Sequence, residues 1–484
     1  MKYYHNRILP FFIKSIFFLF PFFLISGPLL SDLFVIVLFF IFLIFARRIE
    51  YKNIMNNYLF KFFILFYFYI NINSLGGSFP FISLQTSIPY LRLIFFPFII
   101  VFFFNIFVDL KKIIIISFFV TYSLLLVDSF VQLSYGYNLL GSPLSPTDRV
   151  SSFFGSKLVM GSFVSRTLPV ILAFTFLVHF KYKKYFQVAL FFIAGILIFL
   201  SNERTASVYY IIIFILYVFL NFKKKSSLLL LLFFSFLFFF LSLIKPSSYQ
   251  RLIFSTLDQF KQTKNIFFPS YRHELHYITA YNIFDDRKLL GHGIKSFRYL
   301  CANEKYAPLS KIEKDNAVYS KKNGFFFLEE KNNETFIIIR SKLGENSSED
   351  YYYRITGTFL KYYKKNGDYV NENELIFSNY EFKNGCNTHP HNIHIQFLSE
   401  LGILGYIFLL VAFLFLLITV FSIFLKYIKA NKLKNKEKFL FFSLIGLLLG
   451  IFPFFPSGNF FNNWLSVIYF FNIACLVFFI KKNR

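Results

Sequence analysis

The chain has 484 residues, of which 56% are hydrophobic and 79 are phenylalanine. A soluble protein of this length does not need so many apolar side chains and cannot bury them all, so the composition excludes an ordinary soluble domain. The net charge of +26 suggests nucleic-acid binding, but most of the excess lies in short clusters between apolar blocks. That placement is typical of membrane proteins. We therefore predict a polytopic protein that contacts membrane lipids and no nucleic acid.

The apolar residues form about twelve blocks, each close to the length that crosses a bilayer core as a helix. The first block follows MKYYHNR and resembles a signal peptide, but no cleavage site stands out, so we expect it to be retained as a helix. The block at 396–427 is longer than one span requires, so it is expected to begin outside the membrane or to be tilted. In chain order the predicted helices are 8–26, 28–46, 57–73, 90–109, 113–132, 157–180, 185–201, 205–222, 226–244, 396–427, 438–455 and 460–480.

Basic clusters follow every second predicted helix. They contain Arg47, Arg48 and Lys52, then Lys111 and Lys112, then Lys181, Lys183 and Lys184, then Lys223, Lys224 and Lys225, then the run 426–438 and the tail 481–484. Because such loops stay in the cytoplasm, we predict a bacterial inner-membrane protein with both termini cytoplasmic. Residues 1–244 then hold helices one to nine, 245–395 form a periplasmic loop domain, and 396–484 hold helices ten to twelve. The expected fold class is an all-α polytopic membrane protein.

The polar segment 245–395 is long enough for a small domain. It includes YRHELHYITAYNIFDD, whose apolar residues have helical spacing, and we expect a mainly helical domain. FFFLEE and TFIIIR resemble short strands. No further structure is assigned between about 300 and 385.

The chain has three cysteines. Cys475 lies in the last apolar block and is expected to pack there. Cys301 and Cys386 lie at the two ends of the unassigned stretch, and in the periplasm a disulfide between them is permitted. One pair offers no spacing test, so two free thiols are equally compatible with the sequence.

Several arginines near the predicted periplasmic face are candidate ligands for an anion. Arg166 lies inside an apolar block, where a charged side chain is costly and usually faces a cavity, an anionic ligand or a partner such as Asp128. Arg204 lies between two apolar blocks, where the alternative is a helix-end charge that reaches the interface. The other candidates are Arg149, Arg272 and Arg287. Guanidinium groups form paired bonds with phosphate oxygens, so the group suits a diphosphate, and no glycine-rich nucleotide loop is present.

The densest polar cluster is CNTHPHNIHIQFLSELG at 386–402. It contains His389, His391 and His394. A zinc site is one interpretation, but the spacing is not that of a standard structural zinc site and no Cys or carboxylate completes it. The other is that one imidazole accepts a proton from an acceptor hydroxyl, which suits histidine near neutral pH. Glu400 is expected to orient this region or to cap a helix.

The sequence HPHNIHIQFLSELGILG resembles the HN-x-x-L-Q-x-x-x-E-x-G signature of the O-antigen ligase and polymerase superfamily. RVSSFFGSKLVMGSFVSR, SNERTA and LLGHGIKSF occur in the order expected for that superfamily, and the large loop falls in the expected gap. The stretch 300–385 departs from the resemblance. A GT-C-like arrangement of helices is implied.

The resemblance implies glycan transfer from an undecaprenyl-diphosphate carrier to an acceptor sugar, without nucleotide, metal or other cofactor. It gives catalytic roles to His391, Arg204 and Arg272. We expect substrate-binding roles for Arg149, Arg166, His389 and Asn392.

The preferred interpretation is a ligase that transfers O-antigen to lipid A–core in lipopolysaccharide biosynthesis. The alternatives are a polymerase that joins lipid-linked repeat units and a protein O-oligosaccharyltransferase. A transporter or flippase is disfavoured because no internal repeat is found.

Overall fold

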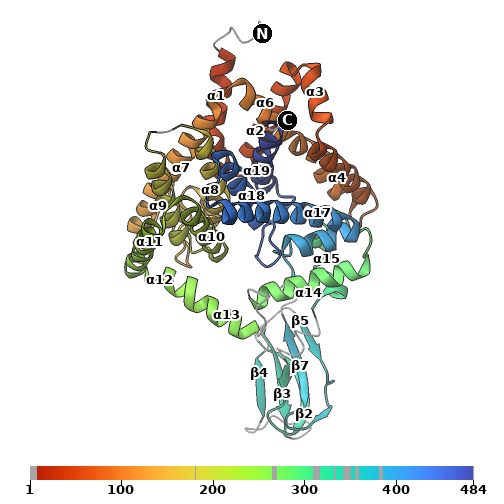
Figure 1. The fold of residues 1–484 in the computed structure, drawn as a ribbon. Helices are drawn as coiled ribbons and strands as arrows, with labels where there is room; N and C mark the ends of the chain where they lie inside the picture. The colour runs from red at the N-terminus through yellow and green to blue at the C-terminus, as the bar shows by residue number, and fades with distance from the viewer. Residues whose placement is uncertain are drawn as a thin grey trace.

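The computed structural model describes residues 8–179, 181–263, 270–308, 317–331, 334–341, 350–354, 359–380 and 385–482. Long apolar helices form a bundle, and a small group of strands projects from one end of it (Figure 1). Within the described residues, eleven helical runs are long and apolar enough to cross a membrane. The chain is therefore a polytopic, mainly α-helical membrane protein, which confirms the predicted fold class.

The spans follow the predicted apolar blocks closely. They are α1 (Ile8–Ser26), α2 (Pro28–Phe45), α4 (Tyr58–Leu75), α5 (Pro80–Ser87) continued by α6 (Leu91–Ile106), α7 (Leu110–Tyr135), α8 (Met160–Leu177), α9 (Lys183–Ser201), α10 (Arg204–Asn221), α11 (Lys224–Ile244), α17 (Ile393–Ala430) and α19 (Asn463–Lys482). The predicted helix at 438–455 is α18 (Asn435–Gly450), which has 16 residues and is buried from Phe439 onward. The short α3 (Arg48–Met55) was not predicted.

Helix α8 lies at the centre of the bundle and packs against α18, α9 and α10. Nearly all of its side chains are buried, although they include polar groups as well as Phe163 and Leu168. Pro169 of α8 lies against Gly446 of α18, where an added Cβ would lie 2.8 Å from Pro169 Cγ. By contrast, α11 buries only Phe234 and Leu241, so most of its apolar surface faces outward, as expected for a lipid-facing helix.

Helix α17 bends sharply at Gly402, which has φ 65° and ψ −171°. The loop after α14 (Tyr271–Asp286) packs into this bend, since Gly291 and Gly402 approach so closely that a Cβ on either would clash with backbone. The Gly293 N–H donates to the Glu400 carbonyl at 2.8 Å, and the Ile403 N–H to the Lys288 carbonyl at 2.8 Å. These contacts fix α14 against the first turns of α17.

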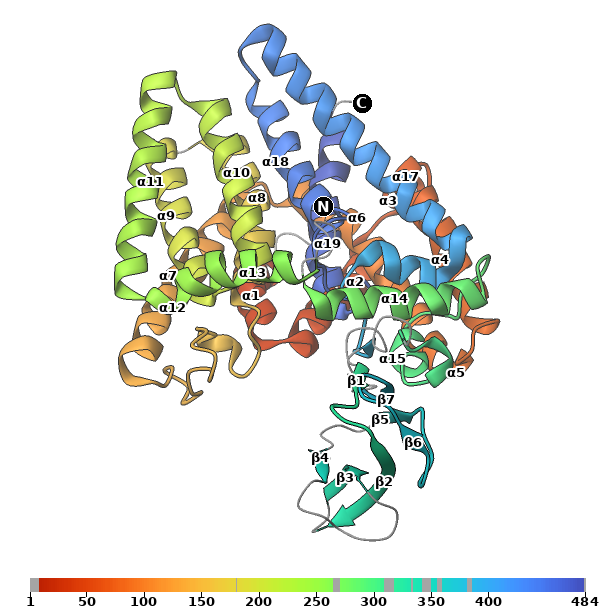
Figure 2. The same cartoon turned by 90° about the horizontal axis from the view of Figure 1, so that it is seen from below.

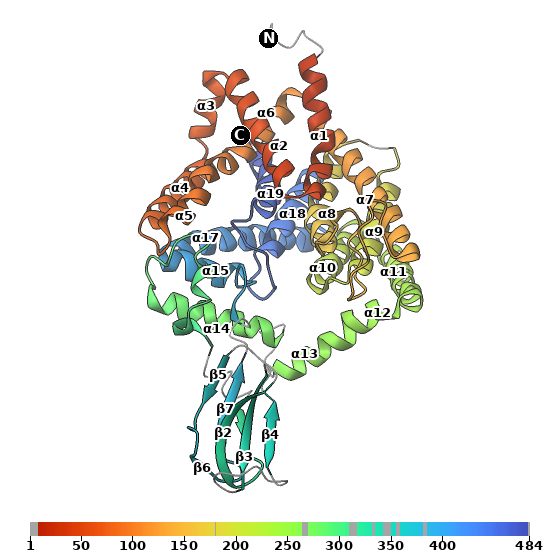
Figure 3. The same ribbon diagram turned by 180° about the vertical axis from the view of Figure 1, so that it is seen from behind.

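The polar segment begins with a chain of short helices along one side of the bundle. They are α12 (Pro246–Tyr249), the π-helical turn η4 (Gln250–Phe254), α13 (Ser255–Thr263), α14, α15 (Phe297–Leu300) and η5 (Glu304–Tyr306). Helices α13 and α14 cross beneath the membrane-type helices (Figures 1 and 2). The start of α1 and the C-terminus lie at the opposite end of the bundle (Figure 3).

The second half of the polar segment forms two small antiparallel sheets. One has the order β1 (Ala317–Tyr319), β7 (Leu375–Tyr380), β5 (Phe359–Tyr362); the other has the order β4 (Tyr351–Arg354), β3 (Glu334–Arg340), β2 (Gly324–Lys331), β6 (Tyr369–Val370). The predicted strands FFFLEE and TFIIIR are confirmed as β2 and β3, which pair Phe326 with Ile339 and share a small apolar core. The predicted helical character therefore applies to the first half of the segment.

A disulfide joins Cys301 and Cys386 at the base of this strand module, with the two Cα atoms 4.9 Å apart. Both residues contact the apolar cluster that includes Ile283 and Phe297. The bond ties the module to α14 and α15 at the point where the chain returns towards α17. Cys475 is buried in α19 as a free thiol.

Candidate functional site

Four imidazole rings meet where α14 approaches the start of α17. The ring centroid of His391 lies 4.2 Å from that of His389, 5.4 Å from that of His276 and 5.5 Å from that of His273. His273 and His276 share one face of α14 because residues three apart are neighbours on a helix. Ser270 caps that helix and bonds to His273 Nδ1 at 2.6 Å. We call these four residues the histidine cluster.

The backbone at His391 is fixed by bonds to the loop before α19. His391 has a left-handed φ of 58°, and its carbonyl accepts the Ser457 N–H at 2.8 Å. Asn392 caps α17 by accepting two backbone N–H groups, and its Nδ2 donates to the Pro453 carbonyl at 2.6 Å. Asn392 thus holds the turn that presents His391, and its predicted contact with substrate stays a prediction.

The histidine cluster favours neutral imidazoles. Burial is the main cause that lowers the pKa of His276 and His389 to about 3 and that of His273 to about 4. Burial also lowers the pKa of His391, and the positive charge of Arg272 adds to that effect. Neutral imidazole keeps a lone pair at neutral pH, as a general base requires.

The hydrogen bonds of Asn387 indicate which nitrogen of His391 carries the lone pair. Asn387 Nδ2 lies 3.0 Å from His391 Nε2, while Asn387 Oδ1 accepts the Thr388 N–H at 2.7 Å. The amide NH₂ group therefore faces the ring and donates to Nε2. Asn387 is exposed, so a donor on a ligand can take its place.

Three guanidinium groups gather around the turn between α9 and α10. Asn202 adopts a left-handed φ of 56° there, and Arg204 begins α10. Arg149 Nε donates to the last carbonyl of α9 at 3.0 Å, and Arg251 Nε donates to the Asn202 carbonyl at 3.3 Å. Arg204 Nε donates to the Arg251 carbonyl at 3.3 Å, and its Nη1 bonds to a glutamine of α13.

The positive charge of this group is only partly offset. Glu203 Oε1 lies 3.8 Å from Arg149 Nη2, but the Glu203 carboxylate also accepts two backbone N–H groups at the start of α8, at 2.8 and 3.0 Å. Neither Arg204 nor Arg251 has a carboxylate within 4.0 Å in the part of the chain that the structure describes. Excess guanidinium charge of this kind attracts an anion.

The start of α14 links the arginines to the histidine cluster. Burial is the main cause that lowers the pKa of His273, and its neighbour His391 is the second. The positive charges of Arg204 and Arg272 lower that pKa further. Arg272 is exposed. The structure therefore brings Arg149, Arg204 and Arg272 to the same side of the bundle as His389 and His391.

A large apolar cavity adjoins Arg204. It measures about 960 Å³ and lies between α10, α11 and the α12–η4 turn. Among the described residues that line it, Arg204 is the one charged side chain, and the others are apolar, such as Phe214 and Phe238, or carry hydroxyl groups. A cavity of this kind suits a lipid chain with an anionic headgroup at the arginine.

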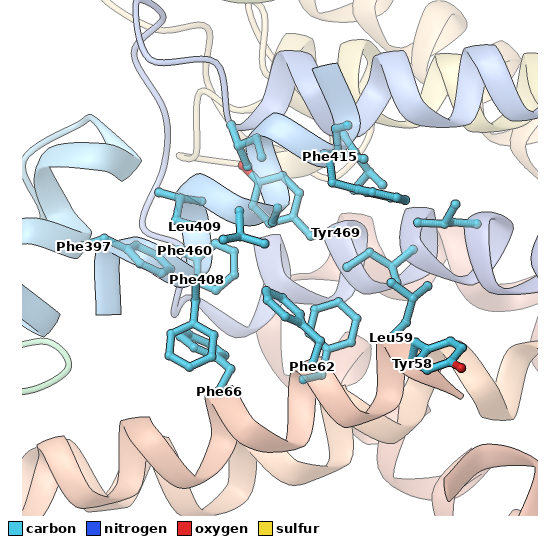
Figure 4. A pocket seen from close by; sticks show the side chains of 18 residues that line it. Tyr58, Leu59, Phe62, Phe66, Phe397, Phe408, Leu409, Phe415, Phe460 and Tyr469 are labelled. Carbon is cyan, nitrogen blue, oxygen red and sulfur yellow. The ribbon is translucent and has the colours of Figure 1, made fainter. Parts of the chain in front are cut away.

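A second apolar cavity of about 270 Å³ lies between α4, α17, α18 and α19. Figure 4 shows aromatic side chains from all sides turned into it, among them Phe66, Phe397, Phe408 and Phe460. Phe397 belongs to the first turns of α17, close in sequence to His391. None of the described residues that line this cavity is charged.

Residues 189–320 match the family model described as O-antigen ligase. This segment of the chain is similar to the O-antigen ligase family. The matched range contains Arg204, Arg251, Arg272, His273 and His276, whereas His391 lies beyond it. No curated protein sequence matches the chain. The match supports a membrane protein related to glycan ligases and polymerases.

Arg166 lies deeper in the bundle than the other predicted arginines. Its side chain is 6% exposed, donates to the Ser162 carbonyl at 3.3 Å and lies over the Tyr209 ring at 5.7 Å. Asp128 is not its partner, because that carboxylate accepts the Leu139 N–H and the Ser152 hydroxyl.

Three further residues considered from the sequence lie outside the histidine cluster. Arg287 donates to the Gly76 carbonyl at 3.0 Å at the far end of α14. His394 bonds through one nitrogen to the Ile451 carbonyl and through the other to Tyr406. Glu400 is fully buried beside the bend of α17, where its carboxylate accepts from Gln396 at 3.0 Å.

The sequence interpretation missed Arg251, His273 and His276. Both histidines follow the recognised Arg272 and lie three residues apart on α14, so their spacing was an available signal. Arg251 lies in a π-helical turn, which has no sequence signature. The described residues contain no group of three or more His, Cys, Asp or Glu side chains arranged to hold a metal ion.

Proposed function

We propose that the chain is a ligase that transfers glycan from undecaprenyl diphosphate to lipid A–core, at the periplasmic face of the bacterial inner membrane. This proposal rests on three features that lie on the same side of the bundle. An apolar cavity of about 960 Å³ is lined by Arg204, and no carboxylate of the described residues lies within 4.0 Å of that guanidinium group. His391, whose lowered pKa favours the neutral imidazole, is the third.

The donor binds with its lipid chain between α10 and α11 and its diphosphate at the arginines. Arg204 binds phosphate oxygens through planar, charge-assisted bonds, and Arg272 approaches from α14. Arg149 is restrained by its bonds to two backbone carbonyls, so it contributes positive charge at a fixed position. Arg166, one turn further into the bundle than Ser162, adds to the positive field.

The acceptor hydroxyl replaces the Asn387 amide as the donor to His391 Nε2. The hydroxyl oxygen attacks the anomeric carbon of the donor sugar, a new C–O bond forms, and the bond to the diphosphate breaks with its electron pair on the leaving oxygen. The hydroxyl proton passes to His391 and then to solvent. Arg204 and Arg272 stabilise the charge that grows on the diphosphate, which is the larger part of catalysis in such a site.

The alternative within the same family is a polymerase, in which the acceptor is a second lipid-linked repeat unit. The apolar cavity between α4 and α17 offers space for the lipid part of either acceptor. A protein O-oligosaccharyltransferase would use the same arginines and the same base. The three activities differ in the acceptor and not in the chemistry.

Deletion of the gene in its host, followed by electrophoresis of lipopolysaccharide, separates these activities. Loss of all O-antigen from lipid A–core, with polymer left on the carrier, is the expected result. A core that bears a single repeat unit identifies a polymerase instead. Unchanged lipopolysaccharide overturns the proposed acceptor. Complementation with wild type and with Arg287→Ala, which lies outside the site, serves as the control.

A further inference from the structure

His276 is buried without a hydrogen-bond partner. Its side chain is 2% exposed, and neither Nδ1 nor Nε2 has a partner within the described residues. A buried polar atom left without a partner destabilises the folded state, because it has lost its hydrogen bonds to water. Such a group therefore calls for an explanation, and a ligand that is absent from the free protein is one.

Another buried histidine of the same segment gives the comparison. His292 is also 2% exposed, but its Nδ1 bonds to Ser78 Oγ at 2.7 Å and its Nε2 to the Ile283 carbonyl at 3.0 Å. His292 thus joins α14 to the loop after α4 and serves the fold. Among the described residues, His276 makes no such bond that would explain its imidazole as a part of the fold.

His276 lies next to the proposed base. Its ring centroid is 5.4 Å from that of His391, with the ring planes tilted by 43°. The ring centroid of His273, one turn earlier on α14, lies 5.5 Å from that of His391, so both histidines of α14 adjoin the proposed base. This place beside His391 puts His276 near the acceptor hydroxyl that His391 would deprotonate.

A neutral imidazole donates one hydrogen bond and accepts another, and so does a hydroxyl group. A phosphate or carboxylate offers only acceptors, and an apolar group would leave both nitrogens unpaired. A sugar hydroxyl can therefore bond to either nitrogen of His276, whichever one carries the proton. We propose that His276 binds the acceptor sugar through a hydroxyl group beside the one that His391 deprotonates; this rests on the proposed function.

The test compares His276→Phe with His292→Phe in the purified full-length chain. Thermal unfolding and binding of deacylated lipopolysaccharide core oligosaccharide are measured without donor, and initial rates are measured with lipid-linked glycan. For His276→Phe we expect an unchanged or higher melting temperature, an acceptor Kd and KM at least tenfold higher, and a donor KM within twofold of wild type. For His292→Phe we expect a lower melting temperature and wild-type acceptor binding in the folded fraction.

Three results overturn the inference. They are an unchanged acceptor Kd in His276→Phe, a fall in its melting temperature as large as that of His292→Phe, and a donor KM that rises as much as the acceptor KM. Failure of the proposed function is distinguishable, because binding needs no donor. If wild type binds the core oligosaccharide and His276→Phe does not, yet no transfer occurs, the sugar site stands and the ligase proposal fails.

Discussion

Replacement of Arg204 by alanine removes the guanidinium group that faces the large cavity. The loss of one preorganised group that stabilises charge in a transition state costs about 100- to 1000-fold in kcat. We expect the kcat of Arg204→Ala to fall by an amount in that range. The reason is that no carboxylate among the described residues lies within 4.0 Å of Arg204, so its charge is available to the substrate. Arg204→Lys keeps the charge but loses the planar paired donors, so a loss of about tenfold is expected.

The assay is single-turnover transfer of labelled glycan from lipid diphosphate by protein in nanodiscs. Arg204 also bonds to the Arg251 carbonyl and to α13, so the variant must first match wild type in thermal unfolding and in membrane insertion. Arg287→Ala removes a bond to the Gly76 carbonyl at the far end of α14 and is the matched control. A folded Arg204→Ala protein with kcat within threefold of wild type would refute the role of Arg204.

Three further predictions concern pH, the disulfide and the core. Burial and the charge of Arg272 lower the pKa of His391, so the rate of transfer should be nearly constant above pH 6.5. The rate should fall only as the pH drops through the lowered pKa, where His391 becomes protonated. A rate that rises on acidification would contradict the role of His391 as a neutral base. The disulfide between Cys301 and Cys386 closes a loop with a sequence separation of 85, so reduction should destabilise the strand module by about 4–5 kcal/mol in the loop-entropy estimate. Differential scanning calorimetry with and without reductant measures this, and Cys301→Ser should be insensitive to reductant. Gly446→Ala forces a Cβ to 2.8 Å from Pro169 Cγ and should cost about 1–3 kcal/mol; an unchanged melting temperature would show that the helices separate freely.

The membrane-type helices could be predicted because the length of an apolar block directly fixes a span. The short α3 was missed because it has only 8 residues, half of them polar, and is too short to cross a membrane. The strand module was predicted only at β2 and β3, a hairpin that is local in sequence. Pairings such as β1 with β7 join distant segments through side chains whose pattern is visible only after folding.

The candidate site divides in the same way. His391 and Arg204 could be identified from local motifs, whereas the position of His276 depends on how α14 packs against the bend of α17. Arg251 enters the arginine group through a π-helical turn and a backbone bond to Arg204. The possible pairing of Asp128 with Arg166 was wrong because nearer polar groups of the loop after α7 occupy that carboxylate.

The central claim is that one site joins a lipid diphosphate to a hydroxyl acceptor through His391. The most direct measurement incubates the purified chain in liposomes with labelled glycan on undecaprenyl diphosphate and with lipid A–core, and follows both products. The account predicts labelled lipid A–core and released lipid diphosphate in equal amounts with wild type, and neither with His391→Ala. No transfer by wild type, or equal transfer by His391→Ala, would contradict it.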